Sequence, residues 1–238
     1  MIRPSLREFN QMRPVSMEIN VNKWAEGSCL IKVGGTQVLC TASVDLNQPV
    51  WKRVQNKTGG WVSAEYSMLP RAVGARKGRD TIMRDHRSAE ISRLIGRALR
   101  SVVDMELLGR HTITVDCDVI QADGGTRCAA ITGGFVAMVL AVRWLIENNR
   151  IRLDPVRDYV AAVSAGIWKD QAILDLDFEE DCNAEMDANF VMSGRGDIVE
   201  VQATGEQHPF NRADLMNLMN MADEGCRKLI ELQKQVLE

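Results

Sequence analysis

The sequence predicts an α+β or mixed α/β layered fold, because segments that alternate like β-strands are interleaved with three segments of helical periodicity. The clearest strand is 112–121, where apolar and polar residues alternate strictly. The clearest core helix is 128–147, which is apolar almost all round. The chain has 238 residues, 45% of them hydrophobic, so it can bury a sizeable core, and no linker-like segment divides it. We therefore expect residues 1–238 to form a single domain.

Several strands are predicted before the first long helix. Residues 17–21 and 28–33 alternate or run apolar, and 37–44 return as a further strand. The pair Gly34-Gly35 supplies left-handed backbone positions for a tight turn, so 28–44 is predicted to be a hairpin. A further strand is predicted at 61–66.

An amphipathic helix is predicted from Ser88 onward. Its apolar positions recur at helical spacing and form one stripe, made of Ile91, Leu94, Ile95, Ala98, Leu99, Val102 and Val103. Arg93, Arg97 and Arg100 fall outside this stripe. The helix is therefore expected to turn a basic face outward.

The C-terminal half is predicted to hold a second hairpin, a further strand and a long helix. Residues 159–168 and 172–177 are the two arms of the hairpin, and 197–203 is the strand. Asn211, with Asp214 three residues later, has the spacing of a capping box and opens a long amphipathic helix.

Composition excludes several classes of protein. The six cysteines form no C-x-x-C pair and lie mostly inside apolar runs, so we interpret them as reduced core residues rather than a metal site. The N-terminus lacks the uninterrupted apolar stretch of a signal peptide, and no apolar run reaches the roughly 18 residues of a membrane span. The run 126–146 also contains Arg127, Arg143 and a glycine pair. We expect a soluble, cytoplasmic protein.

Charges of opposite sign are segregated along the chain, although the formal net charge is only -3. Residues 71–100 carry Lys77 and eight arginines against three acidic residues. The arginines are Arg71, Arg76, Arg79, Arg84, Arg87, Arg93, Arg97 and Arg100. Residues 175–187 carry seven carboxylates and no lysine or arginine. The basic segment suits a polyanion, and the acidic segment suits a hard cation such as Mg²⁺.

The stretch QADGGTRCAAITGG marks the point where a strand ends and a buried helix begins. Unpaired backbone N–H groups and the positive end of the helix dipole attract anions there. Gly124 and Gly125 allow close approach of the backbone. Thr126 can cap the helix and donate its hydroxyl, and Arg127 offers a planar fork for phosphate oxygens. The alternative is a tight turn with a capped helix and an exposed arginine; the Walker signature is absent, so ATP binding is not implied.

The acidic segment has two interpretations. Asp175 and Asp177 alternate with leucines and could form the solvated face of a strand. Asp181, Glu185 and Asp187 follow the strand end, where carboxylates can converge on Mg²⁺. If residues 124–127 hold phosphate, the metal interpretation is favoured, because phosphoryl transfer needs a divalent ion to neutralise charge.

Other chemistries find less support. Asp116 and Asp118 could serve a metal-dependent nuclease, but the alternation of their strand explains them more simply. Only three histidines occur and no G-x-S-x-G motif is present, which disfavours covalent acyl catalysis. Aromatic residues are 5% of the chain, so recognition of a nucleic acid through its sugar-phosphate backbone is favoured over base stacking.

Several segments, in order and at the right spacing, closely resemble the ribonuclease PH family, phosphorolytic exoribonucleases that trim bacterial tRNA. They are RPVSMEINVNKWAEGSCLIKVGGTQVLCTASV, WVSAEYSMLPRA, RSAEISRLIGRALRSVVD, TITVDCDVIQADGGTRCAAITGG, AAVSAGI and LDLDFEEDCNAEMDANFVM. The resemblance runs from about residue 3 to the last helix. It implies a core like ribosomal protein S5 domain 2, with a split β-α-β arrangement, and a ring hexamer built as a trimer of dimers.

The resemblance also implies roles for individual residues. It implies that inorganic phosphate, the attacking co-substrate, is held by Arg87, Gly125, Thr126 and Arg127. It implies that Asp181 and Asp187 bind Mg²⁺, and either is a candidate to protonate the leaving 3′ oxygen.

The expected partners are tRNA precursors and other RNA 3′ ends, with no DNA or membrane partner. Arg71, Arg76 and Arg79 match the basic loop of the family and are expected to contact the body of the tRNA; the alternative is solvated surface. The chain departs from the usual TEYGMLPR and DMN patterns at Ala64, Ser67 and Ala188, which concerns loop detail and substrate preference. Two other functions stay open: a non-catalytic ring subunit of an exosome-like complex, and a metal-dependent hydrolytic nuclease.

Overall fold

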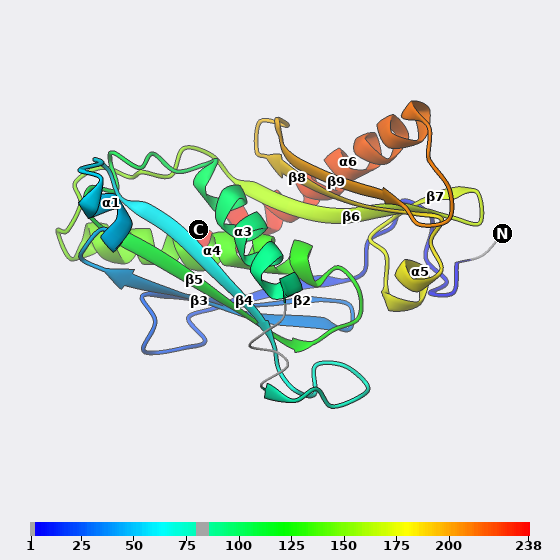
Figure 1. Cartoon of the computed structure of the whole chain (residues 1–238), viewed down its shortest axis with the longest axis horizontal. Helices are drawn as coiled ribbons and strands as arrows, with labels where there is room; N and C mark the ends of the chain where they lie inside the picture. Colours follow the sequence, from blue (N-terminus) through cyan, green and yellow to red (C-terminus); the bar gives the residue numbers. More distant parts are fainter. Residues whose placement is uncertain (1–2, 80–85) are drawn as a thin grey trace.

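The computed structural model, described for residues 3–79 and 86–238, contains two β-sheets and the helices that pack on them (Figure 1). The first sheet has five strands in the order β1-β2-β3-β5-β4. Their bounds are β1 Val15–Ile19, β2 Gly27–Val33, β3 Thr36–Asp45, β4 Trp61–Met68 and β5 Thr112–Gln121. The predicted α+β class and the predicted strands of this half are confirmed. Asp80, Arg84 and Asp85, which count toward the charge of the basic segment, lie outside the described residues.

Strands β4 and β5 are parallel neighbours joined through α3, His86–Arg100. They are hydrogen-bonded to each other directly, so no strand splits this β-α-β unit. The predicted apolar stripe of α3 is buried against the sheet from Ile91 to Leu99. A short helix, α1 (Val50–Val54), was not predicted, because five residues are too few to show helical periodicity.

The basic face predicted for α3 is only partly open. Arg97 forms an ion pair with Glu200 of the second sheet at 2.7 Å. The Arg100 guanidinium donates to the carbonyl oxygen of Val62 at 2.7 Å. Arg93 is exposed. Two of the three arginines outside the apolar stripe therefore attach α3 to the sheets on either side of it.

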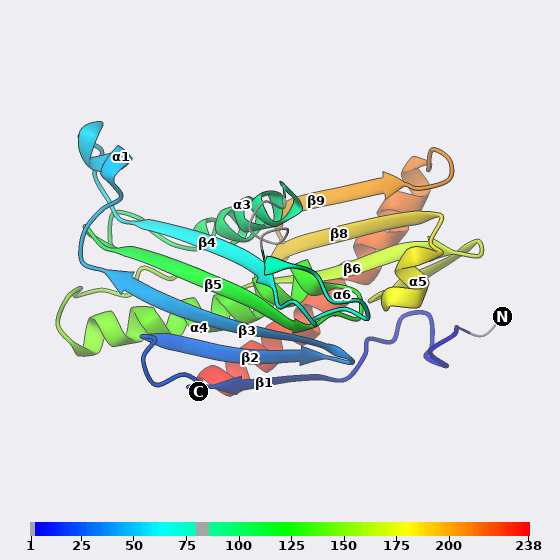
Figure 2. The same ribbon diagram turned by 60° about the horizontal axis from the view of Figure 1, so that its bottom comes forward.

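The second sheet has four antiparallel strands in the order β7-β6-β8-β9 (Figure 2). Their bounds are β6 Val160–Trp168, β7 Gln171–Leu174, β8 Met186–Ser193 and β9 Ile198–Gly205. The predicted hairpin and the predicted strand after it are confirmed as β6-β7 and β9. Strand β8 was not predicted. Both faces of this strand are largely buried, so its sequence shows no alternation of polar and apolar residues.

Two long helices build the core. Helix α4, Thr126–Glu147, packs on the inner face of the first sheet and on β6, as predicted for a buried helix. Helix α6, Arg212–Leu237, covers the other face of the second sheet and begins with the predicted capping box of Asn211 and Asp214. Contrary to expectation, α4 is long and apolar enough to cross a membrane by length and composition alone. Its most apolar window is 78% buried inside the fold, so it serves as a core helix.

Two local predictions were wrong in detail. The turn between β2 and β3 places only Gly34 in the left-handed region, with φ of 54°, whereas Gly35 packs against Asp123. The second hairpin arm ends at Leu174, so Asp175 does not lie on the solvated face of a strand. Asp175 is 3% exposed and therefore needs a partner for its charge.

That partner belongs to a buried ion network, which we define as Arg3, Arg7 and Arg13 with Asp175, Asp177 and Glu180. At its centre, Arg3 Nη2 lies 2.7 Å from Glu180 Oε2, and both side chains are fully buried. Arg13 Nη2 lies 2.6 Å from Asp175 Oδ1, and Arg13 Nη1 donates to the carbonyl oxygen of Asp123. The N-terminal segment thereby fixes the acidic segment and its short helix α5, Phe178–Cys182, beside the start of α4.

Candidate active site

A cavity of about 410 Å³ lies where the end of β5, the start of α4, helix α5 and strand β8 meet. Its lining includes every residue to which the family resemblance assigns phosphate or metal, namely Arg87, Gly125, Thr126, Arg127, Asp181 and Asp187. A wider groove of about 950 Å³ adjoins it over β8 and β9 and shares both arginines and both aspartates. The fold thus brings together residues that the sequence carries in three separate segments.

Gly124 and Gly125 form the turn into α4 in left-handed backbone conformations, with φ of 76° and 64°. A Cβ at Gly124 would lie 2.5 Å from the carbonyl oxygen of Leu176, so this position requires glycine for space as well as for conformation. Gly125 is the N-cap of α4. The first N–H groups of a 22-residue helix are therefore left without intrahelical partners beside the cavity, which suits an anion.

Thr126 does not cap α4, contrary to prediction. It is the first residue of the helix, and no side-chain cap hydrogen bond is formed. Its Oγ1 instead lies 2.8 Å from the Oη of Tyr66, a cavity-lining residue that sequence reasoning missed. Burial raises the pKa of Tyr66, although the Thr126 hydrogen bond and the charges of Arg87 and Arg127 lower it. The phenol is neutral, so this pair of hydroxyls can donate to a bound anion.

Arg127 and Arg87 approach the cavity from the starts of α4 and α3. Within the described part of the chain, Arg127 makes one long hydrogen bond, with 3.5 Å between its Nη1 and Gln202 Oε1. Most of the five N–H donors of that guanidinium therefore stay available to a ligand. Two guanidinium groups therefore lie beside the N-terminus of α4. We call Arg87, Gly125, Thr126 and Arg127 the phosphate corner.

Asp181 on α5 and Asp187 on β8 face the same space. The pKa of Asp187 is raised to about 6, mainly by burial and also by the charges of Asp181 and Glu206, which together outweigh the lowering by Arg127 and Arg87. Burial also raises the pKa of Asp181, against lowering by Arg127 and Arg87 and a further rise from Glu206. Two buried carboxyls with raised pKa values create a place where a proton or a cation is stabilised.

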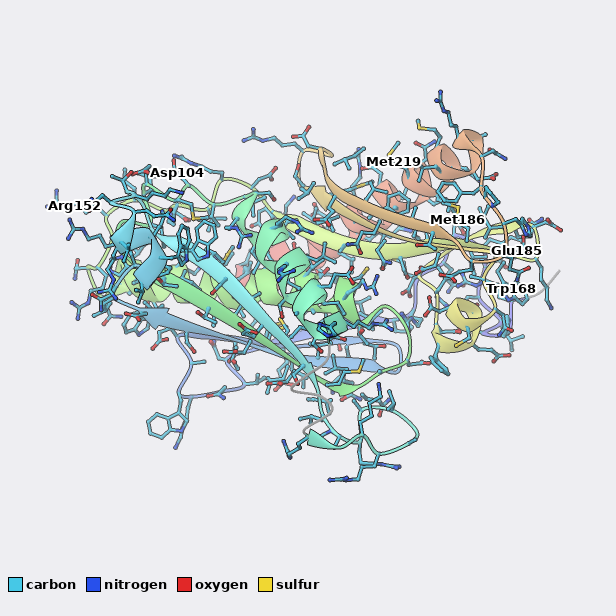
Figure 3. The ribbon with its side chains drawn as sticks, in the orientation of Figure 1. Asp104, Arg152, Trp168, Glu185, Met186 and Met219 are labelled. Atoms are coloured by element: carbon cyan, nitrogen blue, oxygen red, sulfur yellow. The ribbon has the colours of Figure 1, made fainter. Side chains whose placement is uncertain are left out.

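Glu185 is not part of this cluster, whereas Glu206 is. Figure 3 shows Glu185 next to Trp168 at the outer end of the second sheet, where its carboxylate accepts the backbone N–H of Asp170 at 3.2 Å. Glu206 follows β9 and lines the groove. Sequence reasoning missed Glu206 because it lies outside the acidic segment and reaches the aspartates only through the pairing of β8 with β9.

The three arginines predicted to contact tRNA lie on the loop after β4. Arg71, Arg76 and Arg79 are all exposed, and Arg71 Nη1 donates to the carbonyl oxygen of Gly74 at 3.0 Å. They do not line the cavity, whereas Lys77 of the same loop does. The loop therefore presents one basic group to the cavity and three to the outside.

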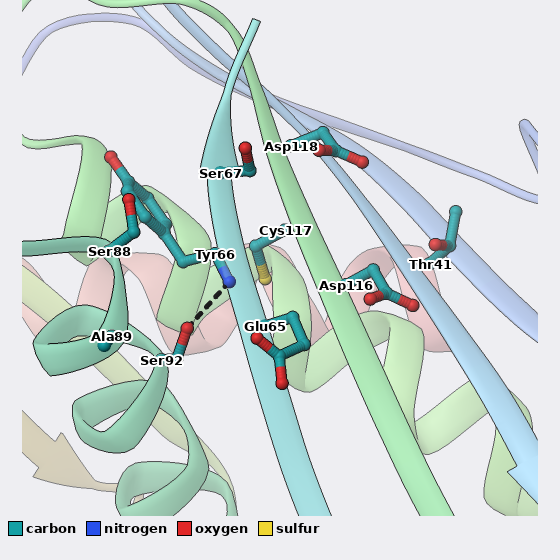
Figure 4. Close-up of a pocket in the computed structure, with 10 residues that line it drawn as sticks. All are labelled: Thr41, Glu65, Tyr66, Ser67, Ser88, Ala89, Ser92, Asp116, Cys117 and Asp118. Atoms are coloured by element: carbon teal, nitrogen blue, oxygen red, sulfur yellow. Dashed lines mark hydrogen bonds between the residues drawn. The ribbon is translucent and has the colours of Figure 1, made fainter. Parts of the chain in front are cut away.

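A separate cavity of about 470 Å³ lies on the outer face of the first sheet (Figure 4). It contains Asp116 and Asp118, together with Glu65. Burial raises the pKa of both aspartates, and for Asp116 the charges of Asp118 and Glu65 add to the rise. These residues lie on the polar face of an alternating strand, as the simpler interpretation of the sequence predicted.

The three departures from the family pattern, at Ala64, Ser67 and Ala188, lie outside the phosphate corner. Ala64 and Ala188 are buried, and Ser67 lines the separate cavity on the outer face of the first sheet. None of them belongs to the lining of the cavity that holds Arg127 and Asp187.

The donor set decides whether Mg²⁺ fits this site. In proteins Mg²⁺ usually keeps several waters and takes one or two carboxylates plus substrate phosphates. Asp181 and Asp187 supply that number of carboxylates beside the corner that suits phosphate. Over the described ranges, no group of three or more His, Cys, Asp or Glu side chains gathers as a complete metal cage. The residues present therefore fit a cation whose remaining ligands are water and substrate.

Two models of one protein family match most of the chain. The model of the 3′ exoribonuclease family, domain 1, matches residues 11–143, and that of domain 2 matches residues 158–225. The chain is 52% identical to a ribonuclease PH of Caulobacter vibrioides over 99% of both chains. It is 50% identical to a ribonuclease PH of Methylobacterium radiotolerans over 99% of this chain and 100% of that one.

Solved structures share the fold. An archaeal exosome core matches with a TM-score of 0.79 at 23% identity, over 98% of this chain and 91% of that one. An Archaeoglobus fulgidus exosome with RNA bound to its active site matches with a TM-score of 0.81 at 24% identity, over 97% and 92%. At these identities the likeness concerns the fold alone. The family models and the full-length relatives go further: the chain belongs to the 3′ exoribonuclease family, and its predicted resemblance to ribonuclease PH is confirmed.

Proposed function

We infer that this protein shortens RNA from its 3′ end by phosphorolysis and releases nucleoside diphosphates. The observation that carries this inference is the meeting of a cationic phosphate corner and a carboxylate pair in one cavity. The corner alone would bind an anion, and the carboxylates alone would bind a cation. Side by side, they can align an attacking phosphate with a phosphodiester.

Inorganic phosphate is the co-substrate. The N–H groups at Gly125 and Thr126 donate to its oxygens, and Arg87 and Arg127 clamp it. One phosphate oxygen attacks the phosphorus of the last phosphodiester, and the bond from that phosphorus to the 3′ oxygen breaks. The phosphorus stays with the departing nucleotide, which becomes a nucleoside diphosphate. The 3′ oxygen of the shortened RNA takes up a proton.

The two aspartates supply the proton and hold the cation. A carboxyl with a pKa of about 6 carries a proton in a useful fraction of molecules near neutral pH, so Asp187 can protonate the 3′ oxygen, with Asp181 as the other candidate. Asp181 and Asp187 would hold Mg²⁺, which would neutralise charge on the transferring group. Because a phosphoester is exchanged for a phosphoanhydride, the reaction is nearly balanced and runs backward when diphosphates are abundant.

The proposed substrates are tRNA precursors and other RNA 3′ ends in the cytoplasm. The exposed Arg71, Arg76 and Arg79 support a contact with the body of a folded RNA. The proposed assembly is a homohexamer made as a trimer of dimers. Residues 1–238 are proposed to act as a single catalytic unit, because segments matched by both family models line one cavity.

The alternative is a non-catalytic RNA-binding subunit of an exosome-like ring. Catalysis is favoured because the phosphate corner and both aspartates occur in one cavity, which a scaffold does not need. The test is product analysis on a tRNA precursor with and without added phosphate. We expect nucleoside diphosphates, and only when phosphate is present. Release of 5′-monophosphates without phosphate would identify a hydrolase, and bound but intact RNA would identify a scaffold; either result overturns the proposal.

A further inference from the structure

Phe178 is an aromatic side chain that lies largely in solvent at the active-site cavity. It is 60% exposed, and it lines the same cavity as the phosphate corner and the aspartates. Single exposed apolar side chains are common on protein surfaces, so exposure alone decides nothing. What sets Phe178 apart is its place beside the reacting groups.

The position of Phe178 is fixed by the buried ion network. Phe178 is the first residue of α5 and follows Asp177, whose carboxylate accepts the backbone N–H of Glu180 in a capping box. Glu180 is held in turn by Arg3 through a fully buried ion pair. An aromatic ring on an anchored backbone loses little conformational entropy when a ligand packs on it.

The same helical turn carries a catalytic aspartate. Side chains three and four positions apart share one face of a helix, so Phe178, Asp181 and Cys182 form one surface, and all three line the cavity. On the N-terminal side, the backbone of Leu176 and Asp177 packs tightly against Gly124. Phe178 is therefore preceded by residues that pack against the phosphate corner and followed by Asp181, and all of these groups belong to one cavity.

Part of the remaining cavity lining is apolar as well. Met68, Val73 and Ala122 contribute side chains to it. An apolar wall does not help to bind phosphate or a metal ion, but the flat ring of a nucleobase can pack against it. We propose that Phe178 is the stacking surface for the base of the 3′-terminal nucleotide of the RNA.

The base-stacking role rests on the proposed function and defines how that site holds its substrate. A phenyl ring has no hydrogen-bonding group and contacts the π-face that every base has, so it grips 3′ ends without selecting among bases. The terminal base leaves as part of the nucleoside diphosphate, whereas the next base stays on the RNA. The same contact must therefore hold the product, and this separates the terminal base from its neighbour.

The main experiment compares Phe178→Ala with the wild-type protein in binding ADP, measured by calorimetry without RNA. Loss of one base–aromatic stack corresponds to about a five-fold to 150-fold rise in the dissociation constant. We expect a rise in that range for ADP and no change in the KM for inorganic phosphate. The fold should be unaffected, because the side chain is mostly exposed.

Matched variants separate the ring from its surroundings. Phe178→Tyr keeps an aromatic ring and should bind ADP as the wild type does, whereas Phe178→Leu keeps apolar bulk and should lose most of the affinity. Trp24→Ala removes an aromatic that is 81% exposed in the loop before β2, and it should have no effect.

Oligonucleotides identify which base is stacked. An RNA with an abasic 3′-terminal nucleotide should be cleaved equally by the wild type and Phe178→Ala. Unchanged ADP binding by Phe178→Ala, or a defect that vanishes only when the penultimate base is removed, overturns the proposal. A changed oligomeric state with intact ADP binding overturns it too, because Phe178 would then be an interface residue. Wild-type protein that binds ADP but releases no diphosphates from RNA would instead overturn the proposed function.

Discussion

The acidic segment 175–187 supplies carboxylates to two clusters that differ in how their charges are balanced. In the buried ion network, Glu180 and Asp175 lie 2.7 and 2.6 Å from their arginines. In the active-site cavity, the charge of Arg127 lowers the pKa values of Asp181 and Asp187, but these described residues form no ion pair with it. One cluster is paired within the described chain, and the other lines a cavity.

This difference separates structural charge from functional charge. Burial raises the pKa of Glu180, but the hydrogen bond and charge of Arg3 more than offset this rise, so that it lies below its usual value. Burial raises the pKa of Asp187 to about 6 without such a partner. A buried charge with a partner is tolerated inside the fold and is costly to leave alone, whereas carboxylates in a cavity without an ion pair can bind a proton, a cation or a substrate. Counting acidic residues in the sequence cannot distinguish the two.

The largest expected effect comes from breaking the structural cluster. Glu180→Ala leaves the Arg3 guanidinium buried without its partner, and loss of one member of a buried pair typically costs about 3–5 kcal/mol. Urea unfolding should show this loss of stability. Glu179→Ala, at the exposed neighbouring position, is the control and should unfold like the wild type. A wild-type unfolding midpoint for Glu180→Ala would mean that the network does not anchor the fold.

Breaking the functional cluster should affect rate and leave stability unchanged. Arg127→Ala removes one charge-assisted donor from the transition state, which typically lowers kcat about 10²–10³-fold. Its thermal unfolding should match the wild type, because Arg127 makes only one long hydrogen bond in the described chain. Arg93→Ala, an exposed arginine of α3, serves as the control for charge. Full turnover by Arg127→Ala would remove this residue from the site.

The raised pKa of Asp187 allows the difference between the two carboxylate clusters to be tested by measuring stability at different pH values. The folded value of about 6 lies above that of an unfolded aspartate, about 3.9, so the folded state holds the proton more tightly. The stability from this group is present at low pH and is lost as pH rises from about 4 to about 6. Asp187→Asn should therefore nearly match the wild type near pH 4 and exceed its Tm near pH 7 by on the order of 5–10 °C.

The Tm series is measured with chelator and without phosphate, so that ligand binding does not enter. Glu185→Gln removes a charge of the same segment outside the cavity and is the matched control. If the Tm difference between Asp187→Asn and the wild type does not change with pH, burial does not destabilise the ionised Asp187 carboxylate in the folded state.

The smallest effect on chemistry is expected from the outer basic loop. Replacing Arg71, Arg76 and Arg79 by alanine should weaken tRNA binding and lower the slope of log K against log salt by about two to three, while cleavage of a short oligonucleotide is unchanged. The matched control is the triple alanine variant of exposed arginines elsewhere, Arg110, Arg150 and Arg152. Equal losses on tRNA and on the oligonucleotide would contradict a remote tRNA contact.

Local pattern was enough to predict part of this molecule. The alternation of 112–121 coincides with β5, and the Gly124-Gly125 turn leads into a helix as its composition indicated. Strand β8 was missed because both of its faces are covered, which removes the alternation that marks a strand. Long-range pairing is the other limit: the buried Asp175 is paired with Arg7 and Arg13, which lie more than 160 residues away in the sequence.

The same limit applies to the active site. Asp181, Asp187 and Arg127 were singled out because they lie in segments with unusual local composition. Tyr66 lies in β4 and Glu206 directly follows β9, and only the pairing of strands and the packing of α4 bring them to the cavity and its adjoining groove. No periodicity within one segment carries that information.

The bond between Arg3 and Glu180 joins positions 177 residues apart. While the chain is being synthesised, Arg3 leaves the ribosome long before the carboxylate that it needs, and contacts of such sequence separation form late in folding. Until that bond forms, α5, which carries Asp181, lacks its fully buried contact with the N-terminal segment. Correct placement of Asp181 therefore requires the chain to have been made at least through the acidic segment, although Arg3 is among the first residues synthesised.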